Sequence, residues 1–166
     1  MLAALKARFN GADDFCLREL TAGGQVLYAL FLDGMTSGSD ISDFVVRPLM
    51  ENLRPGTPEE LYAQAQRGAV WCAVCEEADS AEAAADKLTH GYCVVVFPGL
   101  AKALCFEAKS GTRRGPSAPE SENTVKGAKD AFTETIRINT ALVRRHLRTP
   151  ELRLVNKTVG QRTQTN

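Results

Sequence analysis

Five cysteines are the residues of this chain that could most readily take part in chemistry. Cys72 and Cys75 form a CxxC pair, and Cys93 and Cys105 could supply two further thiolates to a tetrahedral zinc ion. Three of these four lie in continuous apolar runs, however, where a free cysteine usually acts as a small buried hydrophobe. An odd number of cysteines without an export signal also indicates reduced thiols. We therefore expect core thiols and no metal site.

The two histidines do not suggest a catalytic group. His90 stands beside a glycine turn and His146 among arginines, which places both at helix ends. The sequence contains no glycine-rich phosphate loop, no GxGxxG, no HExxH and no nucleophile elbow. Acidic pairs such as Glu59-Glu60 stand at helix starts or turns, where carboxylates are favoured anyway. We predict no catalytic residue, no cofactor and no enzymatic activity, with an unrecognised hydrolase as a remote alternative.

Arg137 and Asn139 are polar residues in the middle of an apolar helical pattern. Asparagine is a mediocre helix former whose side chain competes for backbone partners, so each of these residues needs a partner. One interpretation is local: Arg137 pairs with a carboxylate of its own domain and Asn139 binds a nearby loop carbonyl, because buried polar groups are normally satisfied. The other interpretation is that the two residues form an interface with another molecule.

A basic cluster follows at residues 144–148, with the sequence RRHLR. It could contact anionic lipid, which is worth about 1 kcal/mol per arginine, or an acidic protein surface. Nucleic acid is not expected, because stacking aromatics and an overall basic charge are both missing. Locally, the arginines could complement the helix dipole and pair with the acidic N-terminal half. With the preceding loop, the candidate interface or ligand-contact residues are Arg113, Arg114, Glu120, Glu122, Arg137, Asn139, Arg144 and Arg145.

An amphipathic helix over residues 130–148 would position the second half of these candidates. Its apolar residues recur at helical steps, and Pro150 ends it. We expect the apolar face to pack against a sheet. The Pro-, Ser- and Glu-rich stretch before it, from residue 113 to 123, is expected to be an extended loop. The residues of the expected buried face are Phe132, Ile136, Val143 and Leu147.

Hydrophobic periodicity and turn residues place the other elements. Helices are expected over residues 2–9, 37–53 (kinked or restarted at Pro48), 57–68 and 80–89. Strands are expected over 14–20, 25–32, 69–75, 92–97, 103–108 and 152–159. This order of hairpins and helical crossovers predicts an α/β (mixed α+β) fold, with a mixed parallel and antiparallel sheet covered by helices. Residues 1–10 would form a short docking helix, 11–160 a single domain, and 161–166 a tail.

Charge is distributed unevenly in this chain of zero net charge. Residues 1–90 carry 7 Lys and Arg against 14 Asp and Glu, whereas residues 91–166 carry 13 against 6. We expect the two halves to fold together and neutralise each other, rather than to leave one exposed charged face. The longest apolar runs, 69–75 and 92–98, are far shorter than the ~20 residues of a membrane-spanning helix. The N-terminal apolar stretch is too short for a secretory signal.

Seven motifs stand in this order along the chain: LKARFNGADDFCLREL (5–20), LFLDGM (30–35), FVVRPLM (44–50), HGYCVVVFPGLAKAL (90–104), PESE (119–122), VKGAKDAF (125–132) and TETIRINTALVRRHLRTPELRL (133–154). They are distributed over most of the 166 residues, from residue 5 to residue 154. In this order they resemble the motifs of the bacterial spore germination receptor A-subunit family.

The resemblance implies a non-catalytic role. It implies the first part of the N-terminal region of a nutrient germinant receptor A subunit, which assembles the receptor and couples nutrient sensing to germination. The implied partners are B- and C-type receptor subunits and other A subunits, and the implied location is the core side of the spore inner membrane, reached through segments absent from this chain. An alternative is a module that binds a small nutrient molecule in a cleft beside the sheet.

Overall fold

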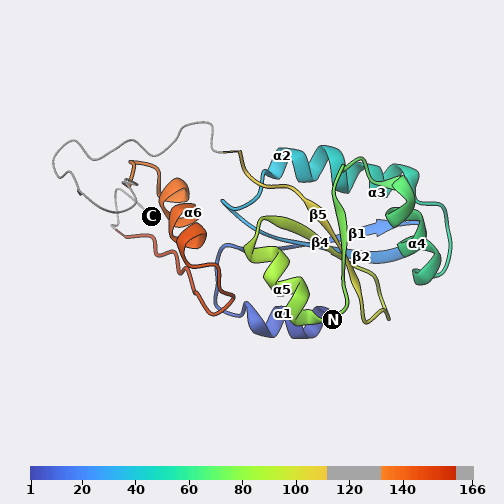
Figure 1. Ribbon diagram of the computed structural model, residues 1–166, viewed down its shortest axis with the longest axis horizontal. Coiled ribbons are helices and arrows are strands. Elements are labelled where there is room, and N and C mark those ends of the chain that lie inside the picture. The colour runs from blue at the N-terminus through green and yellow to red at the C-terminus, as the bar shows by residue number, and fades with distance from the viewer. Residues whose placement is uncertain (112–131, 160–166) are drawn as a thin grey trace.

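The computed structural model describes residues 1–111 and 132–159. Within these ranges, five strands form one sheet that carries helices on both faces (Figure 1). The expectations for Arg113, Arg114, Glu120 and Glu122, for the start of the long helix and for a tail at 161–166 lie outside the described residues. The predicted mixed α+β fold with a helix-covered sheet is confirmed.

The first two strands form the predicted hairpin. Strand β1 (Phe15–Ala22) pairs with β2 (Gln25–Leu32), and the register runs from Phe15 opposite Leu32 to Ala22 opposite Gln25. The turn is the two-residue Gly23-Gly24, with φ angles of 57° and 76°. Positive φ at both turn positions matches the twist of the flanking strands and favours glycine. Strand β1 therefore extends beyond the predicted Leu20 to Ala22.

All strand pairs in this sheet are antiparallel, so the predicted mixture of parallel and antiparallel pairs is wrong. The strand order is β1-β2-β4-β5-β3, with β3 (Cys75–Ala78), β4 (Tyr92–Val96) and β5 (Ala103–Glu107). Strands β3 and β4 do run in the same direction and are joined by a helix, as a parallel crossover requires. Strand β5 lies between them, however, and pairs with both, so it separates the two parallel strands.

One face of the sheet is covered by a long helical hairpin. It comprises α2 (Gly38–Asp40), the π-helical turn η1 (Ile41–Val46), α3 (Arg47–Asn52), α4 (Pro58–Gln64) and a second π-helical turn, η2 (Ala65–Ala69). Pro48 sits in the first turn of α3, where a missing N–H costs little. Thr57 and Glu60 form a capping box at the start of α4. Ile41, Val45 and Leu49 are buried in the core on this face of the sheet.

The opposite face is covered by two short helices, α1 (Leu2–Arg8) and α5 (Ala81–Thr89). Leu5 and Phe9 from the N-terminal segment pack with Leu88 of α5 against this face, and all three are almost fully buried. Strand β4 lies between the two cores and is buried along its whole length. The central strand is apolar on both faces because both of its faces are covered.

Two predicted strands are not found where they were expected. The third strand is Cys75–Ala78 rather than 69–75. The preceding helical segment η2 extends to Ala69, and near its end the chain changes direction at Gly68, which has a φ of 116°. Residues 152–158 are extended but form no strand. They instead lie along the start of β1, where the Asp13 N–H donates to the Leu154 carbonyl at 2.9 Å.

The acidic N-terminal half and the basic C-terminal half do neutralise each other locally. Asp14, Asp33 and Glu77 pair with Arg144, Arg137 and Lys102 respectively, and Arg8 pairs with Glu151 in the reverse sense. Among the described residues, none of the helices combines the length and the apolar character needed to cross a bilayer.

Candidate functional site

Helix α6 (Ile136–His146) carries the sequence-predicted site residues. It lies at one end of the molecule, beyond the end of the sheet rather than over either face (Figure 1). Its contacts to the body are made with the residues that lead into β1 and those that follow β2. The helix is therefore joined to the domain through loops, and its position depends on a few specific side chains.

Arg144 holds the C-terminal half of α6 in place. Its Nε and Nη2 donate to the two carboxylate oxygens of Asp14 at 2.7 and 2.8 Å, and Nη1 donates to the Thr149 carbonyl at 3.2 Å. The Arg144 side chain has no exposed surface, and that of Asp14 is 8% exposed. This bidentate ion pair neutralises both charges and satisfies their hydrogen bonds, as buried ions require.

Arg137 and Asn139 make the local contacts predicted for them. The Arg137 guanidinium donates to the Asp33 carboxylate. The Asn139 amide donates to the Thr133 carbonyl at 2.6 Å, and its oxygen accepts from the Thr133 N–H at 2.7 Å. These bonds confirm the local interpretation of both residues. An interface role for either one stays a prediction.

Gly34 allows α6 to approach the body closely. A Cβ at this position would lie 3.2 Å from the Ala141 Cβ and 3.3 Å from the Arg137 carbonyl oxygen, and the Gly34 φ of 82° disfavours other residues. The helix backbone thus rests directly on the turn after β2.

A polar cavity of about 160 Å³ lies between α6 and the body. Its wall carries three carboxylates and the Arg137 guanidinium, so it offers both signs of charge to a ligand. Part of this charge is already paired internally, through Arg137 with Asp33 and Arg144 with Asp14. The lining residues are Asp13, Asp14, Asp33, Ile136, Arg137, Thr140, Leu154 and Asn156.

The predicted orientation of α6 is wrong. Phe132, Ile136 and Leu147, which were expected to face the sheet, are 69%, 48% and 55% exposed. The side chains that face the body are instead Ala141, Leu142 and Arg144. A hydrophobic pattern counts every arginine as exposed. Because Arg144 is buried, the pattern predicted the wrong face of α6 to be buried. Arg145, the last of the predicted contact residues, is partly exposed beside this buried side.

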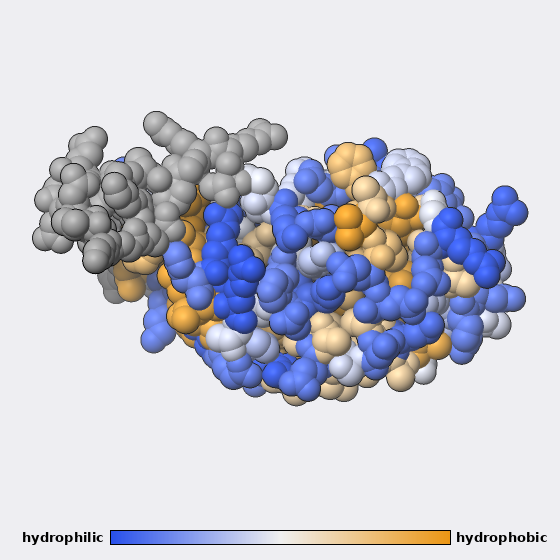
Figure 2. Space-filling model, in the orientation of Figure 1, coloured by the Kyte–Doolittle hydropathy of each residue, from blue (hydrophilic) through white to orange (hydrophobic). Residues whose placement is uncertain are grey.

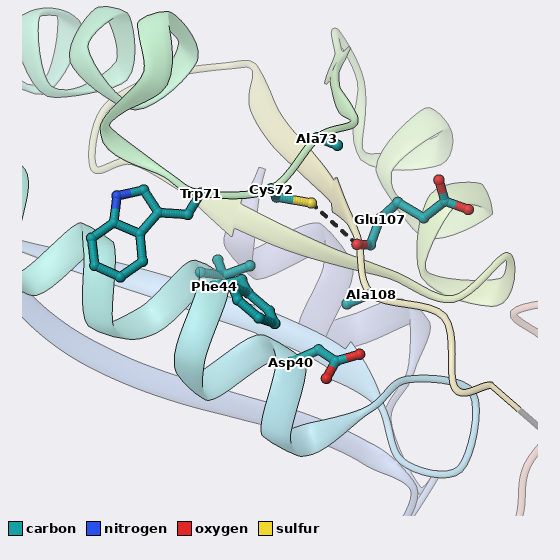
Figure 3. A pocket seen from close by; sticks show the side chains of 8 residues that line it. Asp40, Phe44, Trp71, Cys72, Ala73, Glu107 and Ala108 are labelled. Carbon is teal, nitrogen blue, oxygen red and sulfur yellow. Dashed lines mark hydrogen bonds between the residues drawn. The ribbon is translucent and has the colours of Figure 1, made fainter. Parts of the chain in front are cut away.

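A second pocket, of about 200 Å³, was not anticipated from the sequence. Phe44 and Val45 of η1 form one wall, and Trp71, Cys72 and Ala73 form the other, with Asp40 at the rim (Figure 3). The sequence pattern placed Phe44 in a helix and Trp71 in a strand. The two side chains are 49% and 53% exposed, and the Trp71 N–H donates to the Phe44 carbonyl at 3.1 Å instead of to a strand of the sheet.

The cysteines lie in or beside the cores. Cys93 and Cys105 are buried, and Cys16, Cys72 and Cys75 are partly buried. Burial raises the pKa of Cys93, raises that of Cys105 to about 12 and raises that of Cys75 to about 11, so all three stay protonated thiols. Across the described ranges, no three His, Cys, Asp or Glu residues are grouped so that they could hold a metal ion.

Two adjacent carboxylates on edge strand β3 anchor both helical layers. Glu77 accepts hydrogen bonds from the Tyr62 hydroxyl at 2.6 Å and from Lys102 at 3.3 Å, and the tyrosine bond chiefly holds the pKa of Glu77 below its ordinary value. Glu76 binds Lys87 and the Tyr92 hydroxyl on the other face, which raises the pKa of Tyr92 to about 12. These groups are bound to one another and not poised for proton transfer.

The antiparallel sheet with helices on both faces defines an α+β domain, and helix α6, held by the Arg144–Asp14 pair, lies at one end of it. Residues 3–166 match the family described as the Bacillus/Clostridium GerA spore germination protein, and the chain belongs to this family. The resemblance that the sequence motifs indicated is confirmed.

Curated relatives from Bacillus subtilis match nearly the whole chain. It is 29% identical over 158 residues to the uncharacterized membrane protein YfkQ, 29% over 153 residues to stage V sporulation protein AF, and 27% over 168 residues to spore germination protein B1. These matches cover 95%, 92% and 98% of this chain, but only 30%, 31% and 34% of the relatives. The chain thus spans about a third of the length of the curated relatives it matches.

A solved structure shares the fold. The N-terminal domain of the A subunit of the Bacillus megaterium spore germinant receptor GerK3 superposes with a TM-score of 0.68 at 22% identity. The likeness covers 98% of this chain and 59% of the solved chain. At this identity the comparison establishes the common fold.

Proposed function

We propose that this chain is the first part of the N-terminal domain of a germinant receptor A subunit. In this role it takes part in receptor assembly and in coupling nutrient sensing to germination, through contacts rather than through bond-making chemistry. Family membership over residues 3–166 is the observation that carries the proposal. The fold shared with the GerK3 A-subunit domain and the name of spore germination protein B1 support it.

The proposed partners are B- and C-type receptor subunits and further A subunits. The proposed location is the core side of the spore inner membrane, with membrane segments elsewhere in the full-length protein. The membrane protein YfkQ, of which this chain covers 30%, supports that arrangement. The remaining candidate contact residues on α6, Arg137, Asn139 and Arg145, would face the partners or the ligand.

Co-purification of the full-length protein tests this role. A tagged full-length protein extracted from spore membranes should retain the B- and C-type subunits, and an Arg145→Glu variant should retain them less well. Arg18→Glu, which reverses an exposed charge on β1, is the matched control and should behave as wild type. If deletion of residues 1–166 leaves the recovery of both partners unchanged, the domain has no part in assembly.

The cavity beside Arg137 favours a second candidate function, the binding of a small nutrient. Its arginine and carboxylates could complement the two charges of a zwitterion such as an amino acid. A thermal-shift screen with amino acids, sugars and nucleotides tests this, because a ligand that binds only the native state raises the Tm. Arg137→Ala should abolish the shift, and the absence of a shift with every compound would remove this candidate.

A further inference from the structure

Exposed apolar side chains gather on the C-terminal segment. Of the eleven large hydrophobic residues exposed among those described, six belong to residues 132–159, which make up about a fifth of the described chain. Figure 2 shows apolar atoms on the surface over α6, next to strongly hydrophilic ones. The six residues are Phe132, Ile136, Ile138, Leu147, Val155 and Val159. Single exposed apolar residues are ordinary, but their concentration in one segment is typical of a contact surface.

Part of this surface lies as a stripe along one side of α6. At 3.6 residues per turn, Ile136, Val143 and Leu147 fall on that side. Ile136 and Leu147 are 48% and 55% exposed, Val143 is partly buried, and Ile136 also borders the cavity beside Arg137. Ala141 and Arg144 face the body from the other side. The ion pair of Arg144 with Asp14 therefore fixes the helix with its apolar stripe pointing outward.

Charge sets this segment apart from the rest of the domain. Residues 132–159 carry 6 Lys and Arg against 2 Asp and Glu, whereas residues 1–111 carry 9 against 15. Two of the six, Arg137 and Arg144, are paired with Asp33 and Asp14 of the body, so the other four carry the attraction. Arg148, which follows Leu147 directly, is exposed, whereas Arg145 is partly exposed beside the buried side of α6. Opposite charges on the two parts orient the molecule toward an anionic surface, because such a surface attracts the segment and repels the body.

We propose that the outer surface of α6 and residues 147–159 rests on an anionic phospholipid bilayer. A basic segment with outward apolar side chains is the pattern of helices that lie in the membrane interface: the apolar side chains enter the headgroup boundary and the arginines meet phosphates. The 11-residue helix lies on the membrane and does not span it. The inference rests on the proposed function only in placing the domain beside a membrane.

Vesicle flotation of the 166-residue chain tests the proposal. We expect the chain to float with vesicles of equimolar phosphatidylglycerol and phosphatidylcholine, and to stay in solution with phosphatidylcholine alone. The double variant Ile136→Ser/Leu147→Ser and the double variant Arg148→Glu/Lys157→Glu, at two exposed basic residues, should each weaken binding about tenfold or more, given the apolar area and charge removed. Raised salt should weaken binding of the wild type.

The matched control is Phe44→Ser/Met50→Ser, which removes two side chains of similar exposure, 49% and 52%, from η1 and α3. It should float as wild type does. Unfolding by urea should show that every variant keeps a cooperative native state. Absence of flotation with anionic vesicles, or equal loss in the control and stripe variants, would overturn the proposal.

Light scattering distinguishes lipid binding from the main alternative, in which a second copy of the chain binds the same apolar side of α6. A concentration-dependent dimer that Ile136→Ser/Leu147→Ser disrupts, without any vesicle binding, would assign the stripe to self-association and contradict the lipid proposal. Vesicle binding that persists while the B- and C-type subunits fail to co-purify would leave the lipid contact standing and reject the assembly role.

Discussion

Arg144 and Asp14, 130 residues apart in sequence, are joined by two hydrogen bonds of 2.7 and 2.8 Å in a site almost closed to solvent. This pair connects α6 to the start of β1. Because the arginine occupies a position that an apolar side chain would normally fill, the apolar stripe of the helix is turned outward. One buried ion pair thus determines both where α6 docks and which surface it presents.

Removal of the Asp14 carboxylate should be strongly destabilising. In Asp14→Asn the Arg144 charge stays buried without its partner, and the expected loss is about 3–5 kcal/mol of unfolding free energy. Urea unfolding measures this loss. The control Asp43→Asn removes the exposed pair with Arg47, at 3.1 Å, and should cost less than about 1 kcal/mol. Equal effects in the two variants would mean that the Asp14–Arg144 pair is solvated.

Charges placed on the two sides of α6 should have opposite consequences. Ile136→Asp, at a 48% exposed position that borders the cavity carboxylates, should lower the unfolding free energy by no more than about 1 kcal/mol, because the added charge stays solvated. Leu142→Asp puts an unpaired charge at an 8% exposed position and should undock or unfold the helix. Circular dichroism with urea titration distinguishes the two. Unfolding by Ile136→Asp would restore the stripe-inward orientation predicted from the sequence.

The sequence was informative where a periodicity had a single physical cause. The Gly23-Gly24 hairpin, the buried valine run of β4 and the helices of both layers follow from turn chemistry and burial. The sequence-based prediction was wrong where a charged residue is buried and where the strand order depends on long-range pairing. Arg144 is buried because Asp14, distant in sequence, neutralises it, and the order β4-β5-β3 depends on which strand inserts between two others. Both depend on residues far apart in the sequence, so a local pattern cannot predict them.

The two turn glycines should differ in their tolerance of a side chain. A Cβ on Gly23 would meet the Leu61 Cδ2 at 2.4 Å and the Arg54 carbonyl at 3.1 Å, whereas nothing lies within 4 Å of one on Gly24. Both have positive φ, which costs alanine roughly 1–2 kcal/mol. Gly23→Ala should therefore lower the unfolding free energy clearly more than Gly24→Ala does. Equal losses would show that α4 moves freely away from the hairpin.

Acid should weaken the contact between β3 and α4. The pKa of Glu77 in the folded protein lies below the ordinary value of 4.5, chiefly because the Tyr62 hydroxyl donates to it. Its stabilising contribution is thus present above pH 4.5 and is lost as the pH falls through the folded pKa. Urea unfolding between pH 3 and 7 should show a shallower acid slope for Glu77→Gln than for wild type. Glu51→Gln, which removes an exposed carboxylate from α3, is the control, and an unchanged slope in Glu77→Gln would argue against the prediction.

Thiol labelling of Ile136→Cys and Leu142→Cys tests most directly that α6 is held with its apolar stripe outward, toward a membrane. With labelling resolved by peptide mass spectrometry, Ile136→Cys should react rapidly in solution and become protected when phosphatidylglycerol vesicles are added. Leu142→Cys should react slowly in both conditions. Slow labelling at 136 with fast labelling at 142, or labelling at 136 that vesicles leave unchanged, would contradict the account.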